Sequence, residues 1–278
     1  MSFLNMDQAY VANTYKRFPV EIVSGKGSRV VDVNGKSYVD MGSGIGVTAF
    51  GFGDEAWMAA VTEQLGKVQH TSNLYYTEPC AKLAKLLCEK TGMKKVFFSN
   101  SGAESNECAI KVARKYSAAK KGADCYTIIS LVNSFHGRTL TTLAATGQDH
   151  FHKDFQPLTP GFAHVPANDI EALTEAVATL NPAGIMLECV QGEGGVIPLH
   201  EDFVKGVATL PKGVTSTPWA SKLQRISKSA SGWADMFFTP SWFQILYTPS
   251  VSWVWSAFFL AGSDSILSSC ANSASTGA

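Results

Sequence analysis

The sequence lacks an excess of charge of either sign, and this absence excludes several classes of protein. Its 278 residues include 23 Lys and Arg and 23 Asp and Glu, so the formal net charge is zero, and only 17% of the residues are charged. A chain without a basic surplus creates no overall field that attracts nucleic acid or anionic lipid. We therefore expect neither nucleic acid nor a membrane as a partner. An apolar share of 45% is typical of a globular protein, and the length predicts one or two domains.

Patterns that bind metals, form disulfide frameworks or direct secretion are also missing. The six cysteines show no C-x-x-C pair and no repeated spacing; they are Cys80, Cys88, Cys108, Cys125, Cys189 and Cys270. His150 and His152 have no third ligand type nearby, so we interpret them as loop residues and expect no metal site. Residues 1–8 do not combine a basic segment with a following apolar run. The cytoplasm is therefore the expected location.

Composition changes abruptly near Leu210. Residues 211–278 contain 15 serines and five of the six tryptophans but no Glu and no His, and residues 236–263 contain no charged side chain. The longest apolar run, 251–262, is shorter than the roughly 20 residues that cross a bilayer as a helix. Three interpretations stay open: a membrane anchor, an irregular native segment, or a non-homologous ending such as a shifted reading frame. The composition favours the last of these.

The first 210 residues alternate between strand and helix patterns. Runs 29–33 and 37–41 flank Asn34-Gly35, a pair that suits a two-residue turn, so a β-hairpin is expected. The expected helices are 55–67, 78–90, 104–120 and 170–180, and the expected strands are 96–98, 126–132 and 184–190. Asn168 and Glu171 form a candidate capping box for the last helix. This order predicts an α/β fold whose mainly parallel sheet has helices on both faces.

The chain is expected to divide into three parts. Residues 1–50 form an N-terminal segment with the hairpin, residues 51–210 form a partial large domain, and residues 211–278 form the tail. In parallel sheets, ligands gather at the carboxyl ends of the strands. Loops 99–104, 133–139 and 191–195 each follow an expected strand. We expect all three to contact one ligand.

Each loop has a residue set with its own chemistry. Ser101-Gly102-Ala103 precedes a long helix, where backbone N–H groups and the positive helix end favour a phosphate. Phe135 offers a flat ring, and Arg138 can bind a carboxylate through two parallel hydrogen bonds. Glu188 lies in an apolar strand, where a carboxylate needs a partner or a shifted pKa. Taken singly, each set also fits an ordinary turn, a core ring or a structural charge.

Five motifs together give a family resemblance. They are NTYKRFPV at 13–20, HTSNLYY at 70–76, NSGAESN at 100–106, SFHGRT at 134–139 and QGEGGV at 191–196. From about residue 9 to about residue 209 the chain resembles the class III aminotransferases of fold type I, which use pyridoxal 5′-phosphate. The resemblance implies the large domain of that fold.

The resemblance also implies site residues. Gly102 and Ala103 would present backbone N–H groups to the cofactor phosphate with help from Ser101, and Phe135 would stack on the pyridine ring. Arg138 would bind the substrate α-carboxylate.

Two further side chains are implied at the substrate. Glu188 would lie beside it and help one pocket accept both an amine donor and 2-oxoglutarate, and Tyr15 would line the entrance. The implied reaction moves the terminal amino group of N-acetylornithine, or of a related ω-amino acid, to 2-oxoglutarate in arginine biosynthesis. Family members act as homodimers.

The family's catalytic lysine and its pyridine-pairing aspartate are not found. Family members place both after the position of Leu210, the Asp in an Asp-Glu-Val-Gln-type strand end and the Lys before a glycine run. Lys212, Lys222 and Lys228 have no such context, and neither have Asp235 and Asp264. We therefore expect the fold to be truncated before these segments and this chain to be inactive. The alternative is a catalytically dead fragment or interaction protein that retains a phosphate-binding loop.

Overall fold

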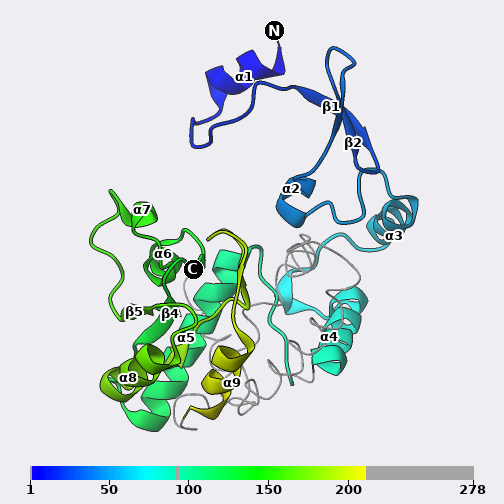
Figure 1. Ribbon diagram of the computed structural model, residues 1–278. Coiled ribbons are helices and arrows are strands. Elements are labelled where there is room, and N and C mark those ends of the chain that lie inside the picture. The colour runs from blue at the N-terminus through cyan, green and yellow to red at the C-terminus, as the bar shows by residue number, and fades with distance from the viewer. Residues whose placement is uncertain (1, 92–93, 211–278) are drawn as a thin grey trace. The chain divides into compact units, whose positions relative to one another are not determined.

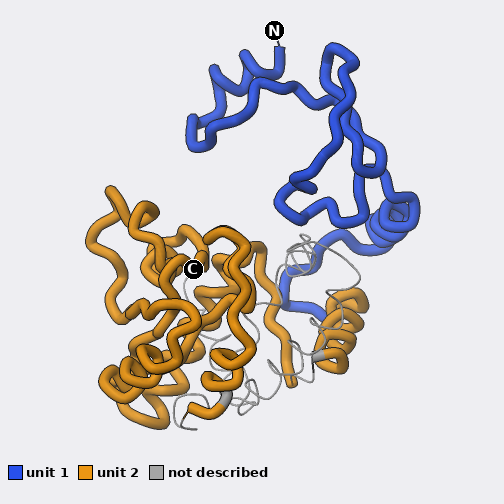
Figure 2. Tube along the Cα trace, viewed as in Figure 1, with its two compact units in different colours: residues 1–76 blue, residues 77–278 orange. Residues whose placement is uncertain are grey.

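The computed structural model describes residues 2–91 and 94–210 (Figure 1). The expectations for the tail, residues 211–278, lie outside the described residues. The chain divides into two compact units, residues 1–76 (unit 1) and residues 77–278 (unit 2) (Figure 2). The unit boundary thus falls 26 residues later than the boundary expected at residue 50, and the three-part domain division stays a prediction.

Unit 1 is built around an antiparallel sheet of three strands, β1 (Ile22–Lys26), β2 (Arg29–Asp32) and β3 (Ser37–Val39). The β2–β3 pair confirms the expected hairpin, with Arg29 opposite Val39. Its connection is longer than the two-residue turn expected, because β2 ends at Asp32 and β3 begins at Ser37. Asp32 Oδ1 fixes this turn by accepting the N–H groups of Asn34 and Lys36, both at 2.9 Å.

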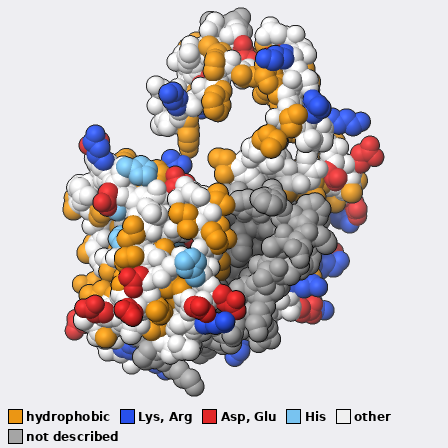
Figure 3. Space-filling view, in the orientation of Figure 1, with side chains coloured by type: hydrophobic (Ala, Val, Ile, Leu, Met, Phe, Trp, Pro, Cys, Tyr) orange, Lys and Arg blue, Asp and Glu red, His pale blue; other side chains and the backbone are white. Residues whose placement is uncertain are grey.

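Short helices complete unit 1. They are α1 (Phe3–Tyr10), α2 (Ser43–Gly46), α3 (Glu55–Leu65) and the 3-10 helix η1 (Ser72–Leu74). Asp54 caps α3 by accepting the Trp57 N–H at 2.7 Å. Many apolar side chains of this unit are exposed, Phe18 and Met41 by about nine-tenths, and the space-filling view shows apolar side chains at the surface (Figure 3).

Unit 2 contains a parallel sheet in the order β5–β4–β6, formed by β5 (Phe162–Val165), β4 (Ile128–Leu131) and β6 (Gly184–Ile185). All four residues of the central strand β4 are buried. A short antiparallel pair, β7 (Val190–Gln191) and β8 (Ile197–Pro198), follows. A strand that is buried on both faces reads as a continuous apolar run, which is why β4 was recognisable in the sequence.

Helices cover both faces of this sheet, as expected (Figure 1). On one face, Ile129 and Leu131 pack with Leu173 of α8 (Ile170–Leu180) and Phe203 of α9 (Glu201–Thr209). The other face packs against α5 (Gly102–Lys121) and α6 (Leu140–Ala145). The remaining helices of unit 2 are α4 (Glu78–Thr91) and α7 (Asp149–His152). Successive residues of β4 point to opposite faces, and this alternation builds the two cores.

Three details of the sequence prediction were wrong. Residues 96–98 form no strand, and the run 184–190 is divided between β6 and β7. The N-cap of α8 is Asp169, which accepts the Ala172 N–H, whereas Asn168 accepts the His200 N–H from across the fold. Strand β5 and helices α6, α7 and α9 were missed because their apolar patterns are short.

Candidate functional site

The start of α5 is the candidate site for an anion. Ser101 caps the helix, and its Oγ accepts the Glu104 N–H at 3.2 Å. Within the described residues, the N–H groups of Gly102 and Ala103 have no hydrogen-bond acceptor. Unpaired N–H groups at the positive end of a 20-residue helix favour a negatively charged group. The small side chains here let such a group approach the backbone.

Acidic and hydroxyl side chains surround the same helix end. The Glu104 carboxylate accepts the Asn100 N–H, so one negative charge already lies at this turn. Ser99 is buried and its Oγ lies 2.5 Å from Ser105 Oγ. These contacts fix the turn before the helix, although residues 96–98 form no strand. The Glu104 charge also opposes a second anion, which reduces the affinity that the free N–H groups provide.

The loop that follows β4 carries a half-buried aromatic ring. Phe135 contacts Phe151 edge to face, with ring centroids 5.6 Å apart. The guanidinium carbon of Arg138 lies 5.8 Å from the Phe135 centroid, and the Arg138 side chain is exposed. The ring therefore makes a cation–π contact with the Arg138 guanidinium. Arg138 leaves its hydrogen-bond donors at the surface, where a carboxylate can reach them.

Glu188 is a largely buried carboxylate between two loops. Its Oε2 accepts the Phe135 N–H at 2.9 Å, and the carboxylate also accepts the Gly192 N–H. Burial raises the pKa of Glu188 to about 7, although these two hydrogen bonds act in the opposite direction. A carboxyl with this pKa changes its charge near neutral pH.

The structure places the three loops in contact. Glu188 reaches the Phe135 backbone, and Asn106 of α5 donates to the His136 carbonyl at 2.7 Å. Gly137 lies against the start of α5, because a Cβ built on it would be 2.8 Å from the Ala103 Cβ. The turn before α5 (residues 99–102), the loop of residues 133–139 (the aromatic loop) and Glu188, between β6 and β7, thus form one cluster within unit 2. The roles expected for their side chains remain predictions.

Tyr15 is the one expected site residue outside this cluster. It belongs to unit 1, its side chain is exposed, and the Arg17 guanidinium carbon lies 5.8 Å from its ring centroid. Its place at a substrate entrance stays a prediction.

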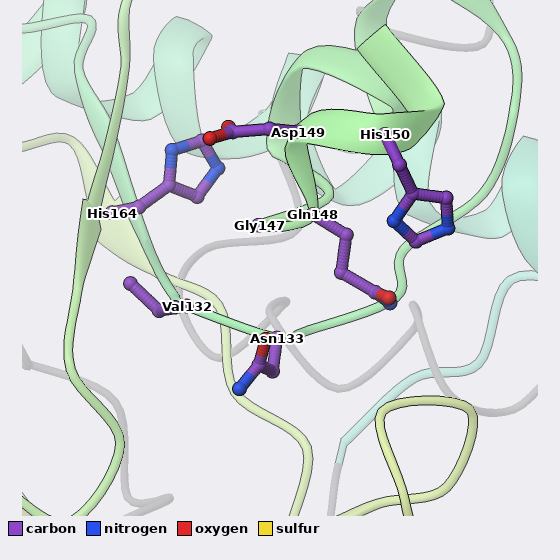
Figure 4. A pocket seen from close by; sticks show the side chains of 7 residues that line it. All are labelled: Val132, Asn133, Gly147, Gln148, Asp149, His150 and His164. Atoms are coloured by element: carbon purple, nitrogen blue, oxygen red, sulfur yellow. The ribbon is translucent and has the colours of Figure 1, made fainter.

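A pocket of about 350 Å³ opens beside the aromatic loop at the carboxyl ends of β4 and β5 (Figure 4). Its lining residues are Val132, Asn133, Gly147, Gln148, Asp149, His150 and His164. Gln148 links this pocket to the loop of residues 191–195, since its Nε2 donates to Glu193 Oε2. Burial lowers the pKa of His164. Among residues 2–91 and 94–210, no cluster of three or more His, Cys, Asp or Glu side chains is arranged to hold a metal ion.

Several residues that shape the cluster were missed in the sequence. Thr146 and His136 are buried, and Thr146 Oγ1 accepts the His136 N–H at 2.9 Å. His136 Nε2 is buried and has no hydrogen-bond partner among the described residues. Burial lowers the pKa of His136 to about 3. The SFHGRT motif contained His136, but nothing in its spacing indicated that the ring is buried.

No helix in the described part of the chain is long and apolar enough to cross a membrane.

The profile of the family "Aminotransferase class-III" matches residues 10–214, and the chain belongs to this family. It is 53% identical over 205 residues to the acetylornithine aminotransferase of Haemophilus ducreyi, an alignment that covers 74% of this chain and 52% of that protein. It is 48% identical over 209 residues to the acetylornithine aminotransferase of Methanocaldococcus jannaschii, covering 75% and 52%. The chain thus spans about half the length of the curated relatives it matches.

Solved structures agree with this assignment. The ornithine aminotransferase of Toxoplasma gondii superposes with a TM-score of 0.70 at 32% identity, covering 75% of this chain and 50% of that one. The N-acetylornithine aminotransferase of Stenotrophomonas maltophilia gives a TM-score of 0.61 at 35% identity, covering 74% and 50%. The α/β fold with its parallel sheet is therefore that of the pyridoxal-phosphate-dependent aminotransferases.

Proposed function

We propose that this chain binds pyridoxal 5′-phosphate at the start of α5, in a site of the acetylornithine aminotransferase type. Its substrates would be small amino acids and 2-oxo acids. The contact between Gly137 and Ala103 carries the proposal, because it joins the anion site to the loop of Phe135 and Arg138. Family membership and the names of the relatives supply the cofactor and the substrate class. The homodimer and the cytoplasmic location remain predictions.

The residues present fit this cofactor. The free N–H groups of Gly102 and Ala103 would donate to its phosphate beside the Ser101 cap, and the half-buried Phe135 ring would stack on its pyridine. When bound, pyridoxal phosphate supplies an electron-withdrawing ring for amino-group chemistry. The Glu104 carboxylate opposes the phosphate charge, so we expect moderate rather than tight binding.

Two side chains would then select the substrate. Arg138 would bind the α-carboxylate through its exposed guanidinium. When ionised, Glu188 would accept a hydrogen bond from an ammonium group. When protonated, it would donate one to the second carboxylate of a 2-oxo diacid. Its pKa of about 7 makes both states accessible near neutral pH. Tyr15 would line the entrance.

No lysine is assigned to hold the cofactor covalently. Lys212, Lys222 and Lys228 lie outside the described residues. We propose that this chain binds the cofactor without turning over substrate. The second candidate, an interaction protein that retains the phosphate site, is favoured by the same lysine contexts.

Equilibrium dialysis with pyridoxal 5′-phosphate and with pyridoxal tests the binding. We expect the phosphate form to bind at least about tenfold more tightly, because two N–H groups bond its phosphate. Ala103→Asp should remove this preference, whereas Ala119→Asp, the same change at the exposed far end of α5, should not. Equal affinity for both compounds would contradict the proposal.

Activity is tested separately. The purified chain is incubated with pyridoxal 5′-phosphate, N-acetylornithine and 2-oxoglutarate, and glutamate is measured. We expect none above background. Glutamate formation that Arg138→Met abolishes would show that the chain is an active aminotransferase and would remove the second candidate.

A further inference from the structure

One buried hydroxyl group lies at the centre of the aromatic loop. Thr146 follows α6 and is completely buried. Its Oγ1 accepts the His136 N–H at 2.9 Å and lies 3.1 Å from the Gly137 carbonyl oxygen and 3.0 Å from that of Thr142. A hydroxyl group has one hydrogen, so it donates to one of these carbonyls at a time while it accepts from His136.

A second side chain bonds the backbone of the same residue. Asn106 Nδ2 donates to the His136 carbonyl at 2.7 Å. Asn106 lies one turn after the N-terminal residues of α5, the helix that begins at the candidate phosphate site. The N–H and the C=O of His136 are therefore bonded by side chains from two different parts of unit 2.

The loop residues with proposed contacts are direct neighbours of this peptide. Phe135 precedes His136, and Arg138 follows Gly137. Gly137 in turn contacts Ala103 at the start of α5. Displacement of the His136 peptide would therefore move the aromatic ring and the guanidinium relative to the phosphate site.

We propose that Thr146 is a positioning residue that fixes the backbone of residues 135–138 against the start of α5, with Asn106 as the second anchor. A threonine hydroxyl that bonds the carbonyl four residues earlier is common in helices, and the Thr142 contact is of that kind. The hydrogen bond that Thr146 Oγ1 accepts from the His136 N–H is of a different kind, because it joins the hydroxyl to another segment of the chain. The link to cofactor binding rests on the function proposed above, whereas the backbone geometry does not.

Matched variants separate positioning from general stability. Thr146→Val keeps the shape and removes the hydroxyl, and Thr146→Ser restores it. Thr174→Val is the control, since among the described residues Thr174 Oγ1 bonds only the Ile170 carbonyl, on the exposed side of α8. Amide hydrogen exchange of residues 134–139 and the dissociation constant for pyridoxal 5′-phosphate are measured for the original chain and for each variant.

We expect Thr146→Val to accelerate exchange of the His136 amide by at least about tenfold and to weaken cofactor binding by about three- to tenfold. Thr146→Ser should restore both values to within about twofold of the original chain, and Thr174→Val should change neither. Original-like exchange and binding in Thr146→Val would overturn the proposal, as would a failure of Thr146→Ser to restore them.

Failure of the proposed function gives a different result. If the original chain shows no saturable binding of pyridoxal 5′-phosphate, the proposed function fails and the exchange rates alone decide the positioning role. If Thr146→Val does not fold, Asn106→Ala takes its place, because it removes the other side-chain bond to the His136 backbone. Unchanged exchange across residues 135–137 in Asn106→Ala would then overturn the proposal.

Discussion

The hairpin of unit 1 and the central sheet of unit 2 are stabilised by different means. In β3 two of three residues are exposed, and Asp32 holds the turn before it through N–H groups two and four residues away. In β4 every residue is buried, and side-chain hydrogen bonds such as that from Gln191 to the Val132 carbonyl join segments 59 residues apart. Local chemistry thus specifies the hairpin, whereas distant segments must meet to build the candidate site.

The largest expected effect comes from deleting core volume in unit 2. Leu173 is fully buried between α8 and the sheet, so Leu173→Ala should destabilise this unit by about 2–5 kcal/mol. Val39 of β3 is half exposed, and Val39→Ala should change the stability of unit 1 by at most about 0.5 kcal/mol. Amide hydrogen exchange resolves the two units. Equal losses of stability in Leu173→Ala and Val39→Ala would contradict the difference drawn between the two units.

Two glycines with positive φ sharpen the same comparison. Gly35 has a φ of +79° and no atom within 4 Å of a built Cβ, so Gly35→Ala should cost only the backbone strain, about 1–2 kcal/mol. Gly137 has a φ of +125°, and its Cβ would be 2.6 Å from Thr142 Oγ1. Overpacking adds about 1–3 kcal/mol to this strain, so Gly137→Ala should cost about 2–5 kcal/mol. Urea denaturation measures the free energy of unfolding of both variants. A smaller loss in Gly137→Ala than in Gly35→Ala would contradict the tighter packing around Gly137.

The sequence predicted those parts of the fold whose signals are local. The Asn34-Gly35 turn, the helix α8 and the buried run that became β4 carry their own patterns. The strand expected at 96–98 failed because three apolar residues do not specify a strand without a hydrogen-bonded neighbour, and none of the described strands pairs with them. Short elements such as β5 have too few residues for periodicity to show.

The candidate site was predictable as a set of loops but not as an arrangement. The SFHGRT motif indicated Phe135 and Arg138, and a carboxylate inside an apolar run indicated Glu188. The order of strands indicated that their loops share one edge. Nothing in the sequence showed that Glu188 bonds the Phe135 backbone or that Thr146 holds the His136 peptide, because these contacts join residues 53 and 10 positions apart. Such pairs follow from packing, which no local pattern encodes.

Acid should weaken unit 2 through His136. Its pKa is about 3 in the folded chain against an ordinary 6.5, so the unfolded chain binds the additional proton. The stability is fully present above pH 6.5 and falls progressively as the pH approaches 3. By pH 4.5 the loss should reach about 2–3 kcal/mol.

Urea denaturation at pH 7 and pH 4.5 measures this loss. His136→Gln, which cannot be protonated, should lose correspondingly less stability between the two pH values. His150→Gln changes an exposed histidine and is the control. Equal losses in His136→Gln and the original chain would show that the buried ring does not cause the acid sensitivity.

The smallest expected effect has the opposite sign and comes from Glu188. Its folded pKa of about 7 exceeds the ordinary 4.5, so the folded chain holds the proton more tightly. This stabilisation is complete below pH 4.5 and is lost as the pH rises through 7. Glu188→Gln keeps an oxygen acceptor for the Phe135 N–H and cannot ionise, so between pH 5 and pH 8 it should gain about 1–2 kcal/mol relative to the original chain. Glu175→Gln, on the exposed side of α8, should show no such change. Parallel pH profiles for Glu188→Gln and the original chain would mean that the carboxylate between the two loops is as well solvated as one at the surface.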